Sequence, residues 1–114
     1  MATPMHLQKV ASCLEALGNE TRLSIFRLLV PYGPTGLSVG DVQRELGVPG
    51  STLSHHLSRL VWEGLVRRER QGRSLMCIAD FEAMDGIIAF MTRECCVLAD
   101  PADVNAPKKT PEPA

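Results

Sequence analysis

The chain is short of aromatic residues, with one tryptophan, one tyrosine and three phenylalanines among 114 residues. Its core must therefore be built mainly from leucine, valine, isoleucine, methionine and alanine, a composition that suits packed helices. A chain of this length predicts one domain with a modest core. Burial of further apolar surface in a dimer would stabilise such a domain.

Long apolar runs are also missing. The first residues, MATPMHLQKVASC, contain no stretch that would serve as a signal peptide or a membrane span. We therefore expect a cytoplasmic protein with no membrane partner. In a reducing compartment the four cysteines, Cys13, Cys77, Cys95 and Cys96, are expected to be thiols or ligands rather than a disulfide framework.

The chain has no strong net charge, since its formal value is −1. The charges are instead segregated along the sequence. Residues 59–73 contain five arginines against two glutamates, and residues 80–94 contain four acidic residues against one arginine. A local positive region of this kind can bind phosphates while the whole molecule stays near neutral.

Apolar residues recur at helical spacing in four segments before residue 65, namely residues 6–17, 20–30, 38–46 and 51–64. Asn19 and Ser51 are expected to cap the second and fourth helices, and Gly47 and Gly64 to follow the ends of the third and fourth. The segment GVPG joins the third and fourth helices, which together predict a helix-turn-helix.

After Gly64 the apolar period changes from about 3.6 to about 2. LVRRER and RSLMCIA then predict a two-stranded hairpin with Gly72 in its turn. A last helix is expected from Asp80 to about Leu98, with an apolar stripe made of Phe81, Met84, Ile88, Met91 and Cys95. The order α-α-α-α-β-β-α predicts a mainly α winged helix-turn-helix with a β-hairpin wing over residues 1–99, and residues 100–114 are expected to be a disordered tail.

The fourth predicted helix combines a buried leucine face with a polar face, and the arginine-bearing hairpin follows it. Small hydroxyl side chains allow close approach to DNA, and the arginines suit phosphates. The candidate DNA-binding residues are Ser51, Thr52, Ser54, His55, Ser58, Arg59, Arg70, Gln71 and Arg73. A solvated polar face is the alternative interpretation. His56 is expected to be a partly buried, hydrogen-bonded structural histidine.

Two linked segments, LEALGNETRLSIFRLL and SVGDVQRELGVPGSTLSHHLSRLVWEGLVRRERQGRSLMC, resemble the ArsR/SmtB family of bacterial metal-responsive repressors. The resemblance covers roughly residues 7–98. It implies a homodimer formed through the first and last helices, binding to double-stranded operator DNA, and release when an inducer binds. Both terminal helices carry apolar stripes, and the candidate dimerisation residues are Leu7, Val10, Leu14, Phe81, Met84, Ile88 and Met91.

Cys95 and Cys96 are the candidate inducer site. The third predicted helix lacks the thiol motif that some members of the family carry, and the last helix lacks histidine, which disfavours zinc, nickel and cobalt. The pair resembles that of arsenical-responsive members, which implies As(III) or Sb(III) as inducer and no organic cofactor. Two cysteines that fill a dimer seam are the alternative.

Inorganic arsenite takes three sulfurs, so a third ligand is expected from Cys77 or Cys13, each of which also suits a buried filler. Methylarsenite needs only two thiols. A thiol redox or persulfide-sensing repressor of the same fold is a further alternative. Because adjacent α-carbons are about 3.8 Å apart, below the usual disulfide range, a disulfide between neighbours would strain a helix. The sequence contains no Cys-x5-Arg loop, no glycine-rich nucleotide loop and no Ser-His-acid set. We therefore do not expect an enzyme.

Overall fold

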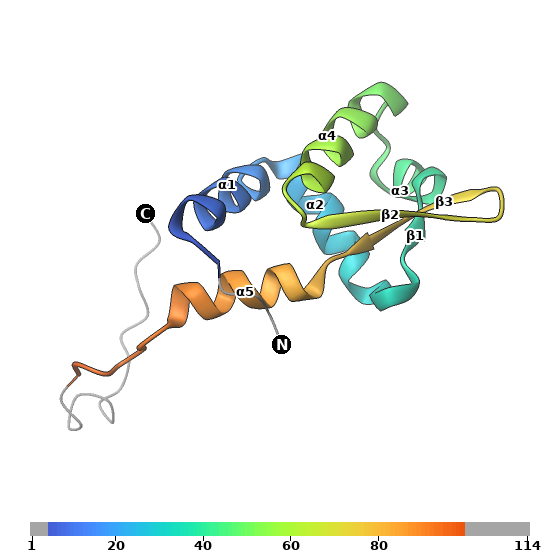
Figure 1. Ribbon diagram of the computed structural model, residues 1–114. Coiled ribbons are helices and arrows are strands. Elements are labelled where there is room, and N and C mark those ends of the chain that lie inside the picture. Colours follow the sequence, from blue (N-terminus) through green and yellow to red (C-terminus); the bar gives the residue numbers. More distant parts are fainter. Residues whose placement is uncertain (1–4, 100–114) are drawn as a thin grey trace.

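Five α-helices and a small antiparallel sheet make up residues 5–99, the part of the chain that the computed structural model describes (Figure 1). The helices are α1 (Leu7–Leu17), α2 (Glu20–Leu29), α3 (Val39–Leu46), α4 (Gly50–Trp62) and α5 (Phe81–Thr92). The other elements are a 3₁₀ segment η1 (Val30–Thr35) and strands β1 (Leu37–Ser38), β2 (Val66–Gln71) and β3 (Ser74–Ala79). This order confirms the predicted winged helix-turn-helix.

Local capping signals account for most helix starts. Asn19 accepts a hydrogen bond from the Arg22 backbone N–H, and Ser38 does the same for Asp41 at the start of α3. The prediction that Ser51 caps the fourth helix was wrong. Pro49 is the N-cap residue, and its carbonyl already accepts from the Leu53 N–H at 2.9 Å. Ser51 therefore lies inside the first turn of α4.

The sheet has the strand order β1-β3-β2, with both pairs antiparallel. Gln71 pairs with Ser74, which leaves Gly72 and Arg73 as a two-residue turn, and Gly72 has the positive φ of +63° that such a turn requires. Strand β1 was not predicted, because two residues give no alternating pattern. Gly36 lets it approach β3, since a Cβ there would lie 2.3 Å from the Cys77 carbonyl oxygen.

The core lies where α1, α2 and α4 meet the sheet. Its fully buried members include Ile25, Leu29, Leu53, Leu57 and Leu60. Cys13 and Cys77 are fully buried in the same cluster and act as small core residues. The aliphatic core that the scarcity of aromatic residues predicted is therefore present.

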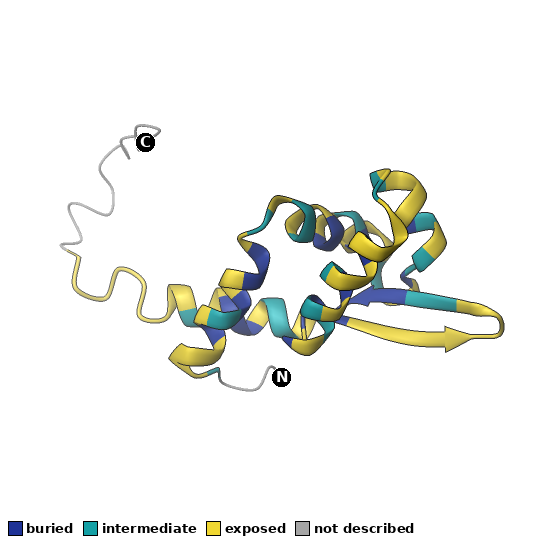
Figure 2. Ribbon diagram, turned by 90° about the horizontal axis from the view of Figure 1, so that it is seen from above, coloured by how far each residue is buried: buried dark blue, intermediate teal, exposed yellow. Residues whose placement is uncertain are grey.

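The last helix is shorter than predicted, because α5 ends at Thr92 rather than near Leu98. Residues 93–98 form turns, and Figure 2 shows this segment exposed along its length. Glu94 and Cys96 have left-handed φ values of 61° and 65°. Helices gain most of their stability from tertiary packing, and beyond Thr92 the apolar stripe has nothing in the described chain to pack against.

The ends of the molecule differ in character. In Figures 1 and 2 the β2–β3 hairpin projects from one end, and α5 extends toward the opposite end, where α1 also lies. No helix in residues 5–99 is long and apolar enough to cross a membrane. The tail predicted at residues 100–114 lies outside the described residues.

Candidate nucleic-acid interface and thiol pair

Helix α4 presents the predicted polar face. Leu53, Leu57 and Leu60 anchor its other side in the core. Its exposed residues include Ser51, Thr52, Ser54, His55 and Ser58. Thirteen residues give a rod of about 20 Å, which fits a major groove. The leucine anchors fix the direction of the polar face relative to the rest of the domain.

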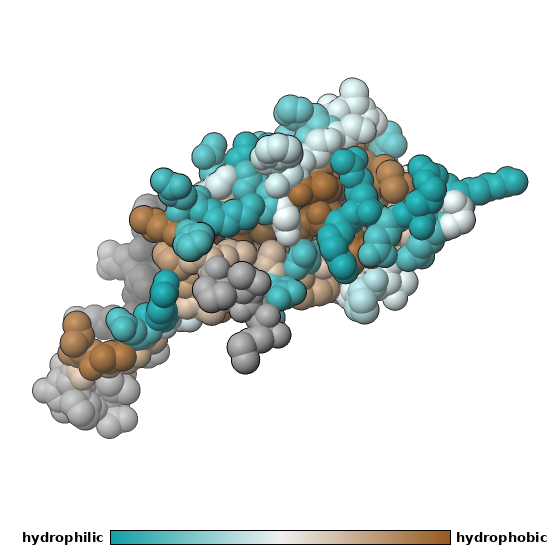
Figure 3. Space-filling model, viewed as in Figure 1, coloured by the Kyte–Doolittle hydropathy of each residue, from teal (hydrophilic) through white to brown (hydrophobic). Residues whose placement is uncertain are grey.

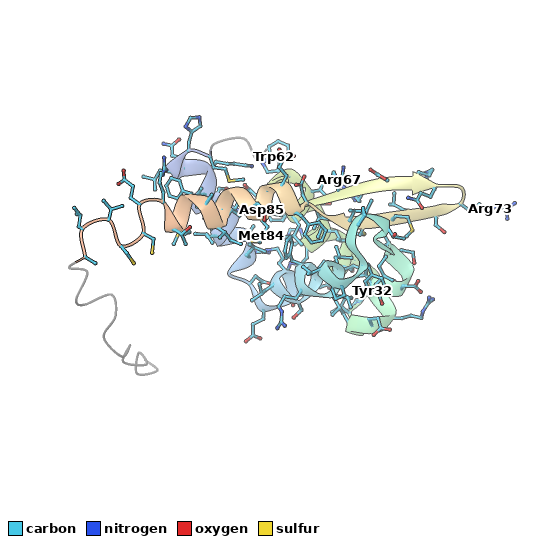
Figure 4. The ribbon with its side chains drawn as sticks, turned by 90° about the horizontal axis from the view of Figure 1, so that it is seen from below. Tyr32, Trp62, Arg67, Arg73, Met84 and Asp85 are labelled. Carbon is cyan, nitrogen blue, oxygen red and sulfur yellow. The ribbon has the colours of Figure 1, made fainter. Side chains whose placement is uncertain are left out.

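Trp62 lies on the same face and was missed in the sequence. It follows Ser51, His55 and Ser58 at steps of four, three and four residues, which places all four on one stripe of α4. Its side chain is 83% exposed. Figure 4 shows it at the end of α4, close to where the hairpin begins. Helical spacing alone indicates Trp62, but the DNA-binding face was predicted from polar residues only.

Arg59, predicted to contact DNA, is only partly exposed. Its Nη2 lies 3.5 Å from Glu63 Oε1, and its Nε is buried without a hydrogen-bond partner among the described residues. Arg59 is therefore directed toward the contact between α4 and α1 rather than wholly into solvent. Arg59 is therefore a weaker candidate for contacting DNA than the exposed serines of α4.

Glu63, directly after α4, is the buried acidic residue of the described chain. Ser12 Oγ donates a 2.6 Å hydrogen bond to its Oε1, and Lys9 Nζ lies 3.4 Å from its Oε2. The Ser12 hydrogen bond and the Lys9 and Arg59 charges lower the pKa of Glu63, against the opposing effect of burial. No local sequence pattern indicates this site, since Ser12 and Glu63 are 51 residues apart.

His56 is the structural histidine that was predicted. It is partly buried, and its Nδ1 lies 3.2 Å from Arg22 Nη1. Arg22 Nε also donates a 2.6 Å hydrogen bond to the Ala16 carbonyl. Burial, then the charges of Arg22 and His55, lower the pKa of His56. The group connects α4 with α1 through α2.

The hairpin carries the predicted positive charge. Arg70, Gln71 and Arg73 are all exposed, and Arg73 extends from the tip in Figure 4. Because side chains alternate along a strand, Arg70 and Gln71 point to opposite faces of the hairpin. Arg67 lies 3.9 Å from Glu69 on one of these faces. The tip therefore offers two cationic side chains and a hydrogen-bonding amide on different sides.

The apolar residues predicted for dimerisation divide into two groups. Leu7, Ile88 and Met91 are 71%, 53% and 62% exposed, and Leu14 and Phe81 are also exposed. In Figure 3, brown and pale brown side chains lie at this end of the molecule with teal side chains among them, whereas the hairpin is mostly teal. Met84 is partly buried against the core. Val10 was wrongly assigned to dimerisation, because it is 2% exposed and belongs to the core of its own chain.

The two neighbouring thiols lie beyond α5, in the exposed turns. Cys95 Sγ and Cys96 Sγ are 3.3 Å apart, a non-bonded contact far longer than the disulfide bond of about 2.05 Å. Both side chains are exposed. Neither residue is in a helix, so the expectation that Cys95 continues the apolar stripe of α5 was wrong. A disulfide between the two cysteines would therefore not have to break a helix.

The candidate third ligands do not join this pair. Cys13 and Cys77 are fully buried, and burial raises the pKa of both thiols. Cys77 in β3 precedes α5, whereas Cys95 and Cys96 follow it, so the length of that helix separates them (Figure 1). No group of three or more histidine, cysteine or acidic side chains within residues 5–99 is arranged to hold a metal ion.

A family profile described as "Helix-turn-helix domain" matches residues 17–69. The HTH-type transcriptional regulator YgaV of Escherichia coli (strain K12) is 32% identical over 89 residues, or 78% of this chain and 88% of the relative. The putative arsenical resistance operon repressor ArsR2 of Halobacterium salinarum is 39% identical over 59 residues, or 52% of this chain and 49% of the relative. The solved structure of an ArsR-like transcriptional regulator from Rhodococcus sp. RHA1 has a TM-score of 0.70 at 24% identity, covering 85% of this chain and 89% of that one.

The helix-turn-helix, its exposed polar face and the wing define a DNA-binding transcriptional regulator, not an enzyme. Among such regulators, the chain belongs to the family of the HTH-type transcriptional regulator YgaV, and its fold is that of an ArsR-like transcriptional regulator.

Proposed function

We propose that this regulator is a homodimeric repressor that trivalent arsenic or antimony releases from its operator by binding Cys95 and Cys96. The observation that carries the proposal is the geometry of the pair, with two exposed sulfurs 3.3 Å apart. The relative named as an arsenical resistance operon repressor supports the same ligand class.

The sulfur separation suits a pyramidal atom better than a tetrahedral one. At a sulfur–metal bond of about 2.3 Å, sulfurs 3.3 Å apart subtend an angle of about 90°. Tetrahedral zinc needs about 109°, which would separate the sulfurs by about 3.8 Å. Trivalent arsenic and antimony keep a lone pair in one position and have bond angles near a right angle.

The number of thiols favours a ligand that needs two. Within the described residues, the other cysteines, Cys13 and Cys77, are sealed in the core. A monomethylated trivalent arsenical fills its remaining position with the methyl group. Each of the two thiols replaces one hydroxide of the arsenical, and that hydroxide leaves as water with the thiol proton. Methylarsenite therefore fits this chain at least as well as arsenite.

In the proposed mechanism the recognition helices α4 of two protomers enter successive major grooves, and Arg70, Gln71 and Arg73 contact the DNA beside them. The dimer forms through the exposed apolar surface of α1 and α5. Glu94 and Cys96 hold left-handed conformations that cost L residues about 1–2 kcal/mol each. Binding at the pair therefore reorganises the segment that follows the dimer helix α5, and couplings of about 1–3 kcal/mol are typical of such sites.

Native mass spectrometry after incubation with arsenite, methylarsenite, antimonite, cadmium or zinc tests the ligand assignment. We expect one arsenic or antimony atom per protomer, and none in a Cys95→Ser/Cys96→Ser variant. Cys13→Ala and Cys77→Ala are the matched thiol controls and should bind as the wild type does. Binding that survives the double serine substitution, or that disappears with Cys13 or Cys77, would rule out the assignment.

Thiol oxidation is the second candidate function, and the position of the pair outside α5 favours it. An oxidant such as hydrogen peroxide would convert the two thiols to a disulfide and itself be reduced to water. The sulfurs must then approach from 3.3 Å to about 2.05 Å. A mass decrease of two hydrogens after peroxide treatment, together with a loss of DNA binding that a reductant restores, would favour this function over arsenical sensing.

A further inference from the structure

The contact between α1 and the end of α4 is built around one carboxylate. Glu63 is 6% exposed, and Ser12 and Lys9 of α1 approach its two oxygens at 2.6 Å and 3.4 Å. Cys13 Sγ lies 3.7 Å from the Glu63 carbonyl oxygen. Three residues of α1 thus converge on the residue that directly follows α4.

A polar contact of this kind has different properties from apolar packing. Burying a carboxylate is costly unless charges and hydrogen bonds compensate for the removed water, and well-packed apolar residues are often at least as stabilising. Glu63 keeps its charge because Ser12, Lys9 and Arg59 surround it. Directional hydrogen bonds restrict the relative positions of two helices more narrowly than contacts between aliphatic side chains, which can slide.

A second polar connection holds α4 near its middle. Arg22 donates to the Ala16 carbonyl at the end of α1 and lies 3.2 Å from His56 of α4. Helix α4 is therefore tied to α1 at two points along its length. If α1 moves, the contacts at Glu63 and at His56 move α4 as a rigid body and change its orientation.

We infer that Glu63 is a positioning residue that transmits movement of the dimer helices to the recognition helix. The inference rests on the proposed function, in which α1 forms part of the dimer and α4 reads DNA. When the inducer shifts α5 and α1 relative to the partner protomer, Ser12 and Lys9 draw the Glu63 carboxylate with them. The end of α4 follows, and the spacing of the two recognition helices changes.

The test compares how strongly inducer weakens DNA binding in matched variants. The DNA is a duplex that the wild-type protein selects from a random pool, and the measured quantity is the ratio of its Kd with arsenite or methylarsenite to its Kd without. We expect a ratio of about 5–150 for the wild type. Glu15→Gln removes an exposed carboxylate from α1 and should give the wild-type ratio.

Glu63→Gln keeps the shape of the side chain and removes its charge. It should reduce the ratio of Kd values to about twofold or less, compared with about 5–150 for the wild type. Ser12→Ala removes only the hydroxyl and should also reduce the ratio, even if Glu63→Gln fails to fold. Ser12→Thr keeps the hydroxyl and should recover most of it. Circular dichroism and the thermal midpoint report separately on folding.

A merely structural role for Glu63 would lower the thermal midpoint and leave the ratio unchanged, and that result would overturn the inference. A wild-type ratio of about one with arsenite, methylarsenite and antimonite would overturn the proposed function as well, since couplings of this class start at about fivefold. The two failures are therefore distinguishable.

Discussion

His56 and Glu63 are two titratable side chains at α4 whose pKa values the fold lowers. A lowered pKa means that the unfolded chain takes up the proton more readily than the folded one, so acid favours unfolding. The stability contributed by neutral His56 is complete above about pH 6.5 and is lost as the pH falls toward its lower folded value. The contribution of ionised Glu63 is complete above about pH 4.3 and is lost below it.

Glu63→Gln should therefore destabilise the protein at pH 7 and matter less in acid. We expect a loss of about 1–3 kcal/mol in the free energy of unfolding at neutral pH, because hydrogen bonds to a charged group are weakened. Urea unfolding at a fixed protein concentration, followed by circular dichroism between pH 7.5 and pH 3.5, measures this difference. A difference that is the same at both ends of the range would show that the carboxylate is not ionised in the folded protein.

Sequence reasoning at the residue scale succeeded where a side chain's role depends on its own helix. The helical period alone placed Ser51, His55 and Ser58 on one face and His56 near the leucines. It could have indicated the position of Arg59, whose guanidinium pairs with Glu63 four residues on. It failed for Glu63 itself, because the environment of its carboxylate is made by α1, far away in the chain. Contacts over such separations leave no local pattern.

At the scale of elements, the order of helices and hairpin was predictable because each has a strong apolar period and a clear turn or cap. The two-residue strand β1 was not, since it exists only through its pairing with β3. The end of α5 was also missed. The apolar stripe from Phe81 to Met91 continues in sequence beyond the point at which the described chain has a surface to pack against.

Substitutions at the tip of the hairpin should affect DNA binding without affecting folding, because the tip is exposed and remote from the core. Replacing Arg70 and Arg73 with alanine should weaken binding to the selected duplex and lower the slope of log K against log salt by about 0.9 for each phosphate that the variant no longer neutralises. Arg27→Ala, an exposed arginine of α2, is the matched control. Fluorescence anisotropy at several salt concentrations gives both slopes, and an unchanged slope in the hairpin variant would exclude phosphate binding there.

At the scale of the whole molecule, the exposed apolar side chains of α1 and α5 gather at the end opposite the wing. Leu7, Ile88 and Met91 are too exposed to contribute much to the core of one protomer. A second copy covering this surface would bury it and set the distance between the two α4 helices. In the proposed mechanism, dimerisation, DNA spacing and inducer response are therefore linked through the same pair of helices.

Ile88→Asp should convert the proposed dimer to a folded monomer, because the side chain is 53% exposed within one chain but apolar. Sedimentation velocity should show the change in mass, and circular dichroism should show retained helix. Leu23→Asp introduces the same charge at an exposed leucine of α2 and should leave the mass unchanged. If Ile88→Asp sediments as the wild type does, the proposed dimer interface on α1 and α5 is wrong.

Binding of a trivalent arsenical at Cys95 and Cys96 is the event on which the proposed release of DNA depends. Its most direct test is an anisotropy titration of the protein–duplex complex with arsenite and methylarsenite, in wild type and in Cys95→Ser/Cys96→Ser. We predict equal DNA affinity for the two proteins without inducer, and release of the wild type alone. Equal release of both proteins, or release of neither, would contradict the proposal.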